Sequence, residues 1–480
     1  MFGASNPHYE VAERTRGFTV GGIGAMLQLA QSTGLVEEID SRLQLLKAHL
    51  PYHESDHVLN IAFNFLAGGH CLEALELLRN DEVYMDALGT QRIPDPTTAG
   101  DFCRRFKAEH VDALQDGINE VRLRVWAQQP ESFFEEAIID ADGTLVETLG
   151  ECKEGMDISH KGLWGFHPLV VSLANTQEPL YLVNRGGSRP SHEGAAERFD
   201  QAIELCRRAG FRAIRLRGDT DFSQTAYLDG WHKEGVRFVF GYDAVANLVK
   251  RAGEVPESAW SRLERLPKYE VKTTERERPE NVKEQIVRER EFTNLRLASE
   301  DVAEFSYSPT QCQQSYRMVV LRKNISVERG EQMLFDEIRY FFYITNDDEK
   351  SAAEIVFDAN QRCNQENLNR QLKSGVPALH APVDTLVSNW AYMVMASLAW
   401  TLKAWFALLL PEAGRWKDKW TAEKQAVLRM QFQTFVNAMM RLPAQVLRQS
   451  RRTIYRILGW NPWLAVFLRG WERVRVPLPC

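Results

Sequence analysis

Short β-rich runs alternate with helical stretches between residues 137 and 241, and this alternation constrains the fold of the 480-residue chain more than any other feature. The β-rich runs span 137–142, 167–173, 180–184, 213–217 and 237–241. A turn-like NTQEP joins the second run to the third, which predicts a hairpin. Helices are predicted at about 193–209 and 223–233. This pattern predicts a mixed α/β sheet that is covered by helices.

The chain after residue 242 begins with a charged stretch. Residues 243 to about 310 show no clear periodicity, and ERERPENVKEQIVRERE lies at their centre. We interpret them as an insertion, after which β structure resumes at 316–321 and 340–345. Long helices are then predicted at about 351–373 and 384–410.

The most apolar segment, residues 390–410, has Lys403 as its one charged residue. Its length would allow it to cross a bilayer, which takes about 20 residues. A helix that is apolar on all sides is also typical of a protein interior. The chain as a whole is 26% charged, so we predict a buried helix and no membrane partner.

Cysteine usage and the chain start both favour a reducing compartment. The seven cysteines are scattered and never form a C-x-x-C pair, so neither a disulfide framework nor a zinc ribbon is predicted. The start, MFGASNPHYEVAERTRG, lacks the apolar stretch of a signal peptide. We therefore expect a cytoplasmic protein.

Charge is unevenly distributed along the chain. The formal net charge is −7, but residues 436–480 hold eight arginines against Glu472 alone, a net +7 that leaves −14 for the rest. Screening acts over about 8 to 10 Å, so local charge matters more than the sum. The basic end, including Arg451 and Arg452, can engage a polyanion. Its alternative is a solvated basic helix.

The region before residue 130 reads as helical, with apolar residues at spacings of three and four. In IPDPTTAGDFCRRF, Pro94 and Pro96 mark a helix start, and Arg104 and Arg105 follow on that helix. These arginines predict either a DNA-reading helix or an ordinary exposed basic turn.

Acidic residues occur where a charge is costly. Asp140 and Asp142 lie in an apolar strand, and as an i, i+2 pair they project from one face. A charge buried there must be paired or must bind a metal. Asp219 follows a second apolar strand, with Asp221 two residues later. Strand ends are where α/β sheets present functional groups, although each aspartate alone also fits a turn or cap.

A third acid lies on a predicted helix. In ANQRCNQENLNRQLKSG, Arg362, Glu366 and Lys373 are four and seven residues apart, so at about 100° per residue they share a stripe about 40° wide. One carboxylate and two cations thus point the same way. The alternative is a surface salt-bridge ladder, which would add little stability.

These residues carry a family resemblance. The order strand Asp, strand-end Asp, helix Glu, with R-x3-E-x6-K around the last acid, resembles the DDE transposases of bacterial insertion sequences, and more closely transposase DDE domain group 1. The signature's tyrosine falls on Ala359. Five segments carry the resemblance in order: RGFTVGGIGAMLQLAQSTGL, DADGT, KEG with HKGLWGFHPLVVSL, RGDTDFS and RCNQENLNRQLKSG.

The resemblance implies a catalytic triad of Asp142, Asp219 and Glu366 on a ribonuclease H-like fold. Asp142 is preferred because it precedes Gly143-Thr144, and Asp140 is the reserve candidate. The resemblance also divides the chain into a helical DNA-binding and dimerisation region, a core in two parts around a β-rich insertion, and a basic helical end: 1–130, 131–242, 243–335, 336–410 and 411–480.

The implied chemistry is phosphodiester cleavage with two divalent ions, which carboxylates bind well. We expect Mg²⁺, with Mn²⁺ able to substitute. The partner is double-stranded DNA, namely the terminal inverted repeats of the element and the target, bound by a homodimer at the bacterial nucleoid. Residues expected to contact DNA are Arg362, Lys373, Arg451, Arg452, Arg104 and Arg105.

Two other functions stay open from the sequence. One is a catalytically silent DNA-binding protein derived from such an enzyme, for which Ala359 leaves room. The other is a stand-alone nuclease of ribonuclease H-like fold without strand transfer. The intact three acids favour an enzyme, and the extra regions at both ends favour a transposase.

Overall fold

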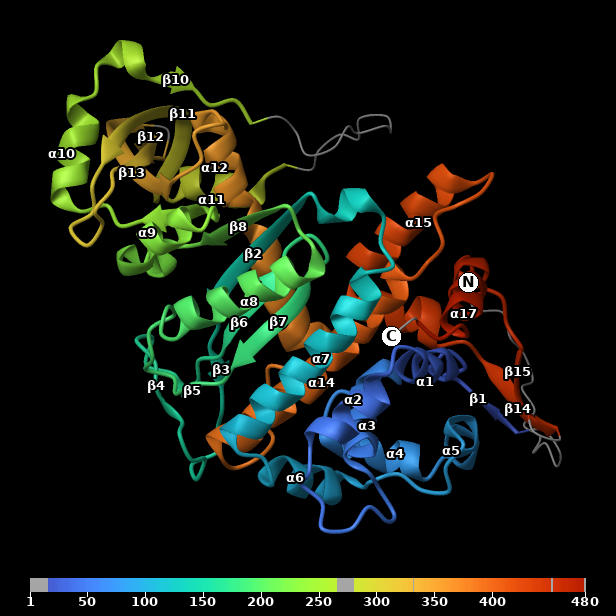
Figure 1. Ribbon diagram of the computed structural model, residues 1–480. Helices are drawn as coiled ribbons and strands as arrows, with labels where there is room; N and C mark the ends of the chain where they lie inside the picture. Colours follow the sequence, from blue (N-terminus) through green and yellow to red (C-terminus); the bar gives the residue numbers. More distant parts are fainter. Residues whose placement is uncertain (1–15, 266–279, 331, 450–451, 479–480) are drawn as a thin grey trace.

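The structure is a computed structural model that describes residues 16–265, 280–330, 332–449 and 452–478 (Figure 1). A large mixed sheet lies beside a mass of helices that is formed by both ends of the chain. The predicted mixed α/β architecture is confirmed.

The large sheet, as far as the structure describes it, has nine strands in the order β10-β11-β12-β13-β9-β8-β2-β6-β7. β2 pairs in parallel with β8, and β8 with β9, whereas the remaining neighbours are antiparallel. The predicted hairpin is β6 with β7. The strand bounds are β2 (Glu136–Gly143), β6 (Leu169–Leu173), β7 (Glu178–Val183), β8 (Ala213–Gly218), β9 (Arg237–Tyr242), β10 (Ser261–Arg262), β11 (Thr293–Tyr307), β12 (Tyr316–Arg329) and β13 (Gln332–Thr345).

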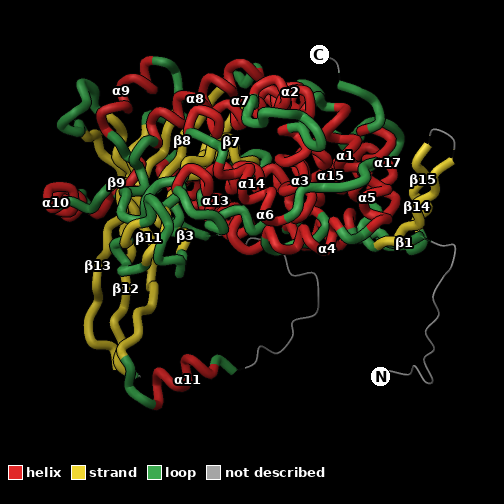
Figure 2. The backbone as a smooth tube through the Cα atoms, turned by 90° about the horizontal axis from the view of Figure 1, so that it is seen from below, coloured by secondary structure: helices red, strands yellow, loops and turns green. Residues whose placement is uncertain are grey.

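The strands β11 to β13 extend far beyond the rest of the sheet, and α11 (Val282–Glu289) lies at their outer end (Figure 2). They join the sheet directly, because Thr345 of β13 pairs with Val239 of β9. For this part of the chain the residue pattern predicted short strands at 316–321 and 340–345 and no strand between 243 and about 310, which is wrong for β11. Its alternation is interrupted by a register shift between Leu297 and Ser299, and much of the strand is exposed on both faces.

Helices pack on both faces of the sheet. α8 (Ala195–Ala209) contacts β2, β6, β7 and β8, with α9 (Thr225–Lys233) beside it through the Phe199–Trp231 contact. α12 (Ala352–Gln361) contacts β9 and β11 to β13, and α13 (Cys363–Arg370) contacts β2. α10 (Ala246–Glu254), which follows β9 in the chain, buries Leu248 and Ala252 in the core.

The single helix predicted for 351–373 is interrupted, which corrects that prediction. Arg362 ends α12 and begins α13, and α13 runs into a π-helical turn, Gln371–Gly375. The sequence shows no proline or glycine at Arg362. The interruption comes instead from the two segments packing on different strands, α12 on β9 to β13 and α13 on β2.

The N-terminal region is helical, as predicted. A small sheet of β3 (Val146–Glu147), β4 (Asp157–Ile158) and β5 (Trp164–Phe166) follows β2 in the chain. The N-terminal helices are α1 (Ile23–Ser32), α2 (Leu35–Arg42), α3 (Glu54–Leu66), α4 (Leu75–Arg79), α5 (Glu82–Leu88), α6 (Pro96–Arg104) and α7 (Ala108–Trp126).

The apolar segment forms α14 (Leu386–Leu408), which packs against β7 and against α3, α6, α7 and α15 (Lys417–Arg429). Among the described residues it is the one helix long and apolar enough to cross a membrane, and its most apolar window is entirely buried inside the protein. The predicted buried helix is confirmed. Lys403 is accommodated because its Nζ donates to the carbonyl oxygen of Leu428 at 2.7 Å.

The C-terminal region is not wholly helical, which corrects the prediction for 411–480. After α16 (Phe432–Phe435), β14 (Ala444–Gln449) and β15 (Arg452–Ile457) form a hairpin, and α17 (Leu464–Val474) follows. Alternating apolar residues, among them Val446 and Ile454, favour strands here. β14 also pairs with β1 (Gly17–Phe18), so the two ends of the described chain meet.

One buried carboxylate joins the sheet to the helices. Glu178 of β7 is fully buried, and its Oε1 accepts hydrogen bonds from Arg122 Nε at 3.1 Å and Trp405 Nε1 at 2.9 Å. Its Oε2 accepts from Trp126 Nε1 at 3.0 Å. Glu178 thereby holds β7, α7 and α14 together at one point.

Replacing Glu178 by Gln should lower the free energy of unfolding by about 3–5 kcal/mol, because it leaves the Arg122 guanidinium buried without its counter-charge. Glu120→Gln is the matched control, since Glu120 forms an exposed ion pair with Arg208, and should cost at most about 1 kcal/mol. Denaturant unfolding of both variants measures the difference. Equal losses would contradict the role given to Glu178.

A candidate active site at the ends of β2 and β8

Two neighbouring parallel strands end in acids at the same edge of the sheet. Asp140 of β2 lies opposite Arg217 of β8 in the register, so Asp142 and Asp219, each two residues further on, follow side by side. Asp142 is mostly buried, and its side chain is 15% exposed, whereas that of Asp219 is 35% exposed. The two strand-borne acids predicted from the sequence therefore lie together.

The third predicted acid is brought to the same place by α13. The Arg362 guanidinium lies among all three carboxylates: 3.9 Å separates Arg362 Nη1 from Asp142 Oδ1, 3.7 Å the same nitrogen from Asp219 Oδ2, and 3.7 Å Arg362 Nη2 from Glu366 Oε1. Glu366 is the most accessible of the three, with its side chain 60% exposed. Acids from β2, β8 and α13 thus converge on one cation.

The electrostatics of the site show an excess of negative charge. Burial raises the pKa of Asp142 to about 7; Arg362 opposes this shift, while Asp219 and Glu366 add to it. Burial likewise raises the pKa of Asp219, against the effect of Arg362. One guanidinium does not compensate three carboxylates, so the site favours a further cation.

Two more residues, Asn369 of α13 and Lys373 of its π-helical turn, bond Asp142 and the chain just after it. Asn369 Nδ2 donates to Asp142 Oδ2 at 2.9 Å, and Lys373 Nζ donates to the carbonyl oxygen of Leu145 at 2.6 Å. Burial lowers the pKa of Lys373, and the nearby Asp142 and Glu147 oppose that shift. The sequence predicted Lys373 at this place but missed Asn369. Asn369 lies three residues after Glu366, a helical spacing that places both side chains on the same side of α13.

Asp140, the reserve candidate, has a different role in the structure. It is 1% exposed and forms a two-pronged ion pair with Arg217: Nε to Oδ1 at 2.7 Å and Nη2 to Oδ2 at 2.9 Å. Arg217 Nη1 also donates to Asp358 Oδ1 of α12 at 3.0 Å. Asp140 is thus paired with Arg217 in the interior, beneath the three carboxylates. Asp221, the acid two residues after Asp219, is exposed.

The ion pairs beneath the site continue along β8. Arg215, also 1% exposed, lies 2.7 Å from Asp347 Oδ2 and 3.3 Å from Asp358 Oδ2 through Nη1. Lys350 Nζ donates to Asp358 Oδ2 at 2.8 Å. Sequence reasoning missed Asp358, although it precedes Arg362 by the same four residues that separate Arg362 from Glu366.

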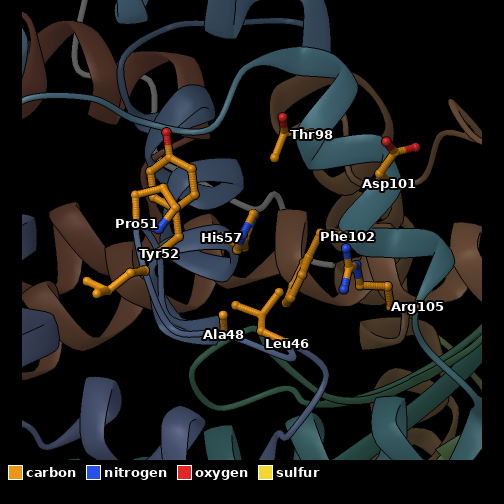
Figure 3. A pocket seen from close by; sticks show the side chains of 10 residues that line it. Leu46, Ala48, Pro51, Tyr52, His57, Thr98, Asp101, Phe102 and Arg105 are labelled. Atoms are coloured by element: carbon orange, nitrogen blue, oxygen red, sulfur yellow. The ribbon is translucent and has the colours of Figure 1, made fainter.

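The two arginines predicted on the first basic helix lie elsewhere. Arg104 is committed to ion pairs with Asp101 and Asp384, both at 2.8 Å. Arg105 is exposed and borders a cavity of about 360 Å³ between α6 and residues 46–52, with His57 and Phe102 at its centre (Figure 3). The three carboxylates are not among the residues that line this cavity, so it is separate from the candidate site.

The basic end of the chain is described in part. Arg452, at the start of β15, is exposed to solvent. Arg451 lies outside the described residues. Arg452 pairs with Gln449 of β14, in a sheet separate from the one that carries Asp142 and Asp219.

The donor set suits a hard divalent cation, because all three side chains offer carboxylate oxygens. Within the described residues, no group of three His, Cys, Asp or Glu side chains is gathered tightly enough to hold a metal ion as it stands. The Arg362 guanidinium lies among the three acids, within 4 Å of each. The chemistry of the residues therefore fits such an ion, with Arg362 displaced.

The chain resembles one known protein family by sequence. Residues 16–476 match the sequence model of the family described as "Transposase DDE domain group 1". Among solved structures, one similar to this chain is the piggyBac transposase synaptic complex with hairpin DNA, at 10% identity and a TM-score of 0.36 over 86% of each chain. A search of the curated proteins found no match.

The raised pKa of Asp142 should make stability depend on pH. The ordinary pKa of an aspartate is 3.8, and that of Asp142 in the folded chain is about 7. Between these two pH values Asp142 keeps its proton in the folded chain and has lost it in the unfolded chain, so the free energy of unfolding falls as pH rises. Asp142→Asn removes this loss. With a chelator present, its melting temperature should exceed the wild-type value by a margin that widens between about pH 4 and 7 and levels off at higher pH. Asp221→Asn is the control, and a constant margin for Asp142→Asn would refute the prediction.

Proposed function

Because the chain belongs to the transposase DDE domain group 1 family, we propose that it is a cut-and-paste transposase. It binds the terminal inverted repeats of an insertion sequence, cleaves the donor strands and joins the 3′ ends to target DNA. The observation that carries the proposal is the convergence of Asp142, Asp219 and Glu366, from three separate elements, on one point.

The proposed fold of the core is ribonuclease H-like. The order β7-β6-β2-β8-β9, with an antiparallel hairpin on one side of β2 and parallel strands on the other, supports it. The proposed regions are 131–242 and 336–410 for the core, 243–335 for the insertion, 1–130 for DNA binding and dimerisation, and 411–480 for the basic end. A homodimer at the nucleoid belongs to the same proposal.

Asp142, Asp219 and Glu366 would hold divalent metal, Mg²⁺ or in its place Mn²⁺. When bound, a pair of such ions activates the attacking oxygen and relieves charge on the leaving oxygen. The chain's own residues supply the arrangement: Asn369 orients the Asp142 carboxylate through its hydrogen bond. Glu366, the most exposed of the three acids, would offer its carboxylate from α13.

Double-stranded DNA would reach the site over the basic side chains. Arg362 and Lys373 lie beside the carboxylates, where a scissile phosphate would bind, and a guanidinium can grip phosphate through two N–H groups. Arg451, Arg452 and Arg105 would attract flanking DNA without reading sequence. Arg104 can join them only by leaving Asp101 or Asp384.

The deciding experiment incubates the purified protein with Mg²⁺ and linear DNA that carries the inverted repeats flanking its gene. Denaturing gels resolve the products. Cuts at the repeat ends that need both metal and Asp142 would establish the transposase. Bound but uncut DNA would instead indicate the silent DNA-binding protein, and cutting without joining the stand-alone nuclease.

Glu366→Gln should leave binding to the inverted repeats intact and reduce cleavage by at least about 100-fold, because it removes the charge of a metal ligand without changing its shape. Gel retardation measures binding, and end cleavage measures the reaction. Glu131→Gln, whose side chain is 90% exposed and pairs with Arg212, is the control and should cleave normally. Cleavage by Glu366→Gln at a near wild-type rate would assign the third acid elsewhere.

Arg452→Glu should weaken DNA binding and flatten its dependence on salt by about one unit or more of log–log slope, because a phosphate contact that releases a counterion is lost. Binding is measured by fluorescence anisotropy at several salt concentrations. Arg212→Glu, which breaks the exposed ion pair of Arg212 with Glu131, serves as the control. An unchanged slope for Arg452→Glu would show that the hairpin does not contact DNA.

A further inference from the structure

Arg362 is held at the site by charge alone. Its guanidinium lies 3.7 to 3.9 Å from the three carboxylates, and within the described part of the chain it makes no hydrogen bond. Arg217, two residues before Asp219, shows the contrast: it is fixed by hydrogen bonds of 2.7, 2.9 and 3.0 Å. The five N–H donors of Arg362 are thus available to a better partner.

The backbone on either side of Arg362 is anchored independently of its side chain. Before it, Asp358 fixes α12 to Arg217 and Lys350. After it, Gln365 Nε2 donates to the carbonyl oxygen of Val170 at 3.2 Å, and Asn369 holds Asp142. The Arg362 side chain can therefore change partners while both helix segments stay in place.

The charge at the site is unbalanced while Arg362 stays there. Three carboxylates face one guanidinium within 4 Å. The other nearby cation, Lys373, donates to the Leu145 carbonyl and makes no ion pair with the three acids in the described structure. A divalent ion would neutralise the carboxylates more completely, but it and the guanidinium would then compete for the same oxygens.

We propose that Arg362 is an exchangeable counter-cation. It holds the three carboxylates together in the free protein, gives up this place to divalent metal, and moves to a phosphate of the bound DNA. The proposal rests on the proposed function, because it needs both metal and DNA at this site. It adds that the two bind cooperatively: DNA draws Arg362 away from the carboxylates and so strengthens metal binding, and metal strengthens DNA binding by the same factor.

The test is a titration of the full-length protein with Mn²⁺, with free Mn²⁺ followed by electron paramagnetic resonance. In wild-type protein, a duplex carrying the inverted repeats should tighten Mn²⁺ binding by about 5- to 150-fold. Arg362→Gln should bind Mn²⁺ about tenfold more tightly than wild type without DNA, since its competitor is gone, and should lose most of the gain on adding DNA.

Arg370→Gln is the matched control, because Arg370 lies on the same helix, is exposed and hydrogen-bonds Asn367. It should behave as wild type. A crystal structure of wild-type protein with Mn²⁺ and no DNA gives an independent measurement, and should show Arg362 out of contact with the three acids.

Two results would overturn the inference and leave the proposed function standing: equal Mn²⁺ affinity of Arg362→Gln and wild type, or a metal complex in which Arg362 keeps its contacts with all three acids. A third result would overturn both proposals: wild-type protein and Asp142→Asn bind the same amount of Mn²⁺ with the same affinity.

Discussion

Two arginines on β8, Arg215 and Arg217, lie in the interior of the protein, and the position of α12 follows from the need to neutralise them. Each is 1% exposed, and the acids that pair with them come from β2, α12 and the loop after β13. Buried ion pairs add little net stability, because desolvation offsets their attraction. Breaking one is costly, however, so the pairs exclude other positions of the helix on the sheet. The network therefore determines geometry more than it raises stability.

The candidate site is the outer end of this same arrangement. Arg215 and Arg217 of β8, with Asp219 just after it, occupy every second position and share one face. Asp140 and Asp142 share one face of β2 in the same way. Along α12 and α13, Asp358, Arg362 and Glu366 recur every four residues. In the interior the acids and bases pair closely. At the rim, three acids meet one loosely held guanidinium. On each strand, the charged residue that forms a buried ion pair, Asp140 or Arg217, thus lies two residues before the carboxylate of the candidate site, Asp142 or Asp219.

The sequence predicted most of the elements whose pattern is local. Strands β2, β6, β7, β8 and β9, the helix α8 and the buried α14 all lie within a few residues of their predicted positions. Costly positions and helical spacing also singled out the acids, and the family resemblance selected Asp142, Asp219 and Glu366 among them.

Other features depend on long-range contacts. The break at Arg362 results from two helix segments packing on different strands. The sequence of β11 shows no strand pattern, because a register shift interrupts its alternation and much of the strand is exposed on both faces. The C-terminal region was predicted to be helical, whereas its hairpin is completed by a pairing of β14 with β1, which lies at the other end of the chain. Asp358 was missed because an aspartate on a helix surface looks ordinary until Arg217 is placed beneath it.

The long ribbon of β11 to β13 has a consequence for how this chain can change in length. Because β13 pairs with β9 only from Phe342 to Thr345, the outer part of the ribbon forms strand pairs, within the described residues, only among its own strands and with β10. Residues can be gained or lost at its tip without moving β8 or Asp219. Such changes must come in pairs on both strands of the β12–β13 hairpin, since a shift of one residue turns every following side chain to the opposite face. Relatives of this chain should therefore vary in ribbon length by even steps, with the inner half and the acids at constant register.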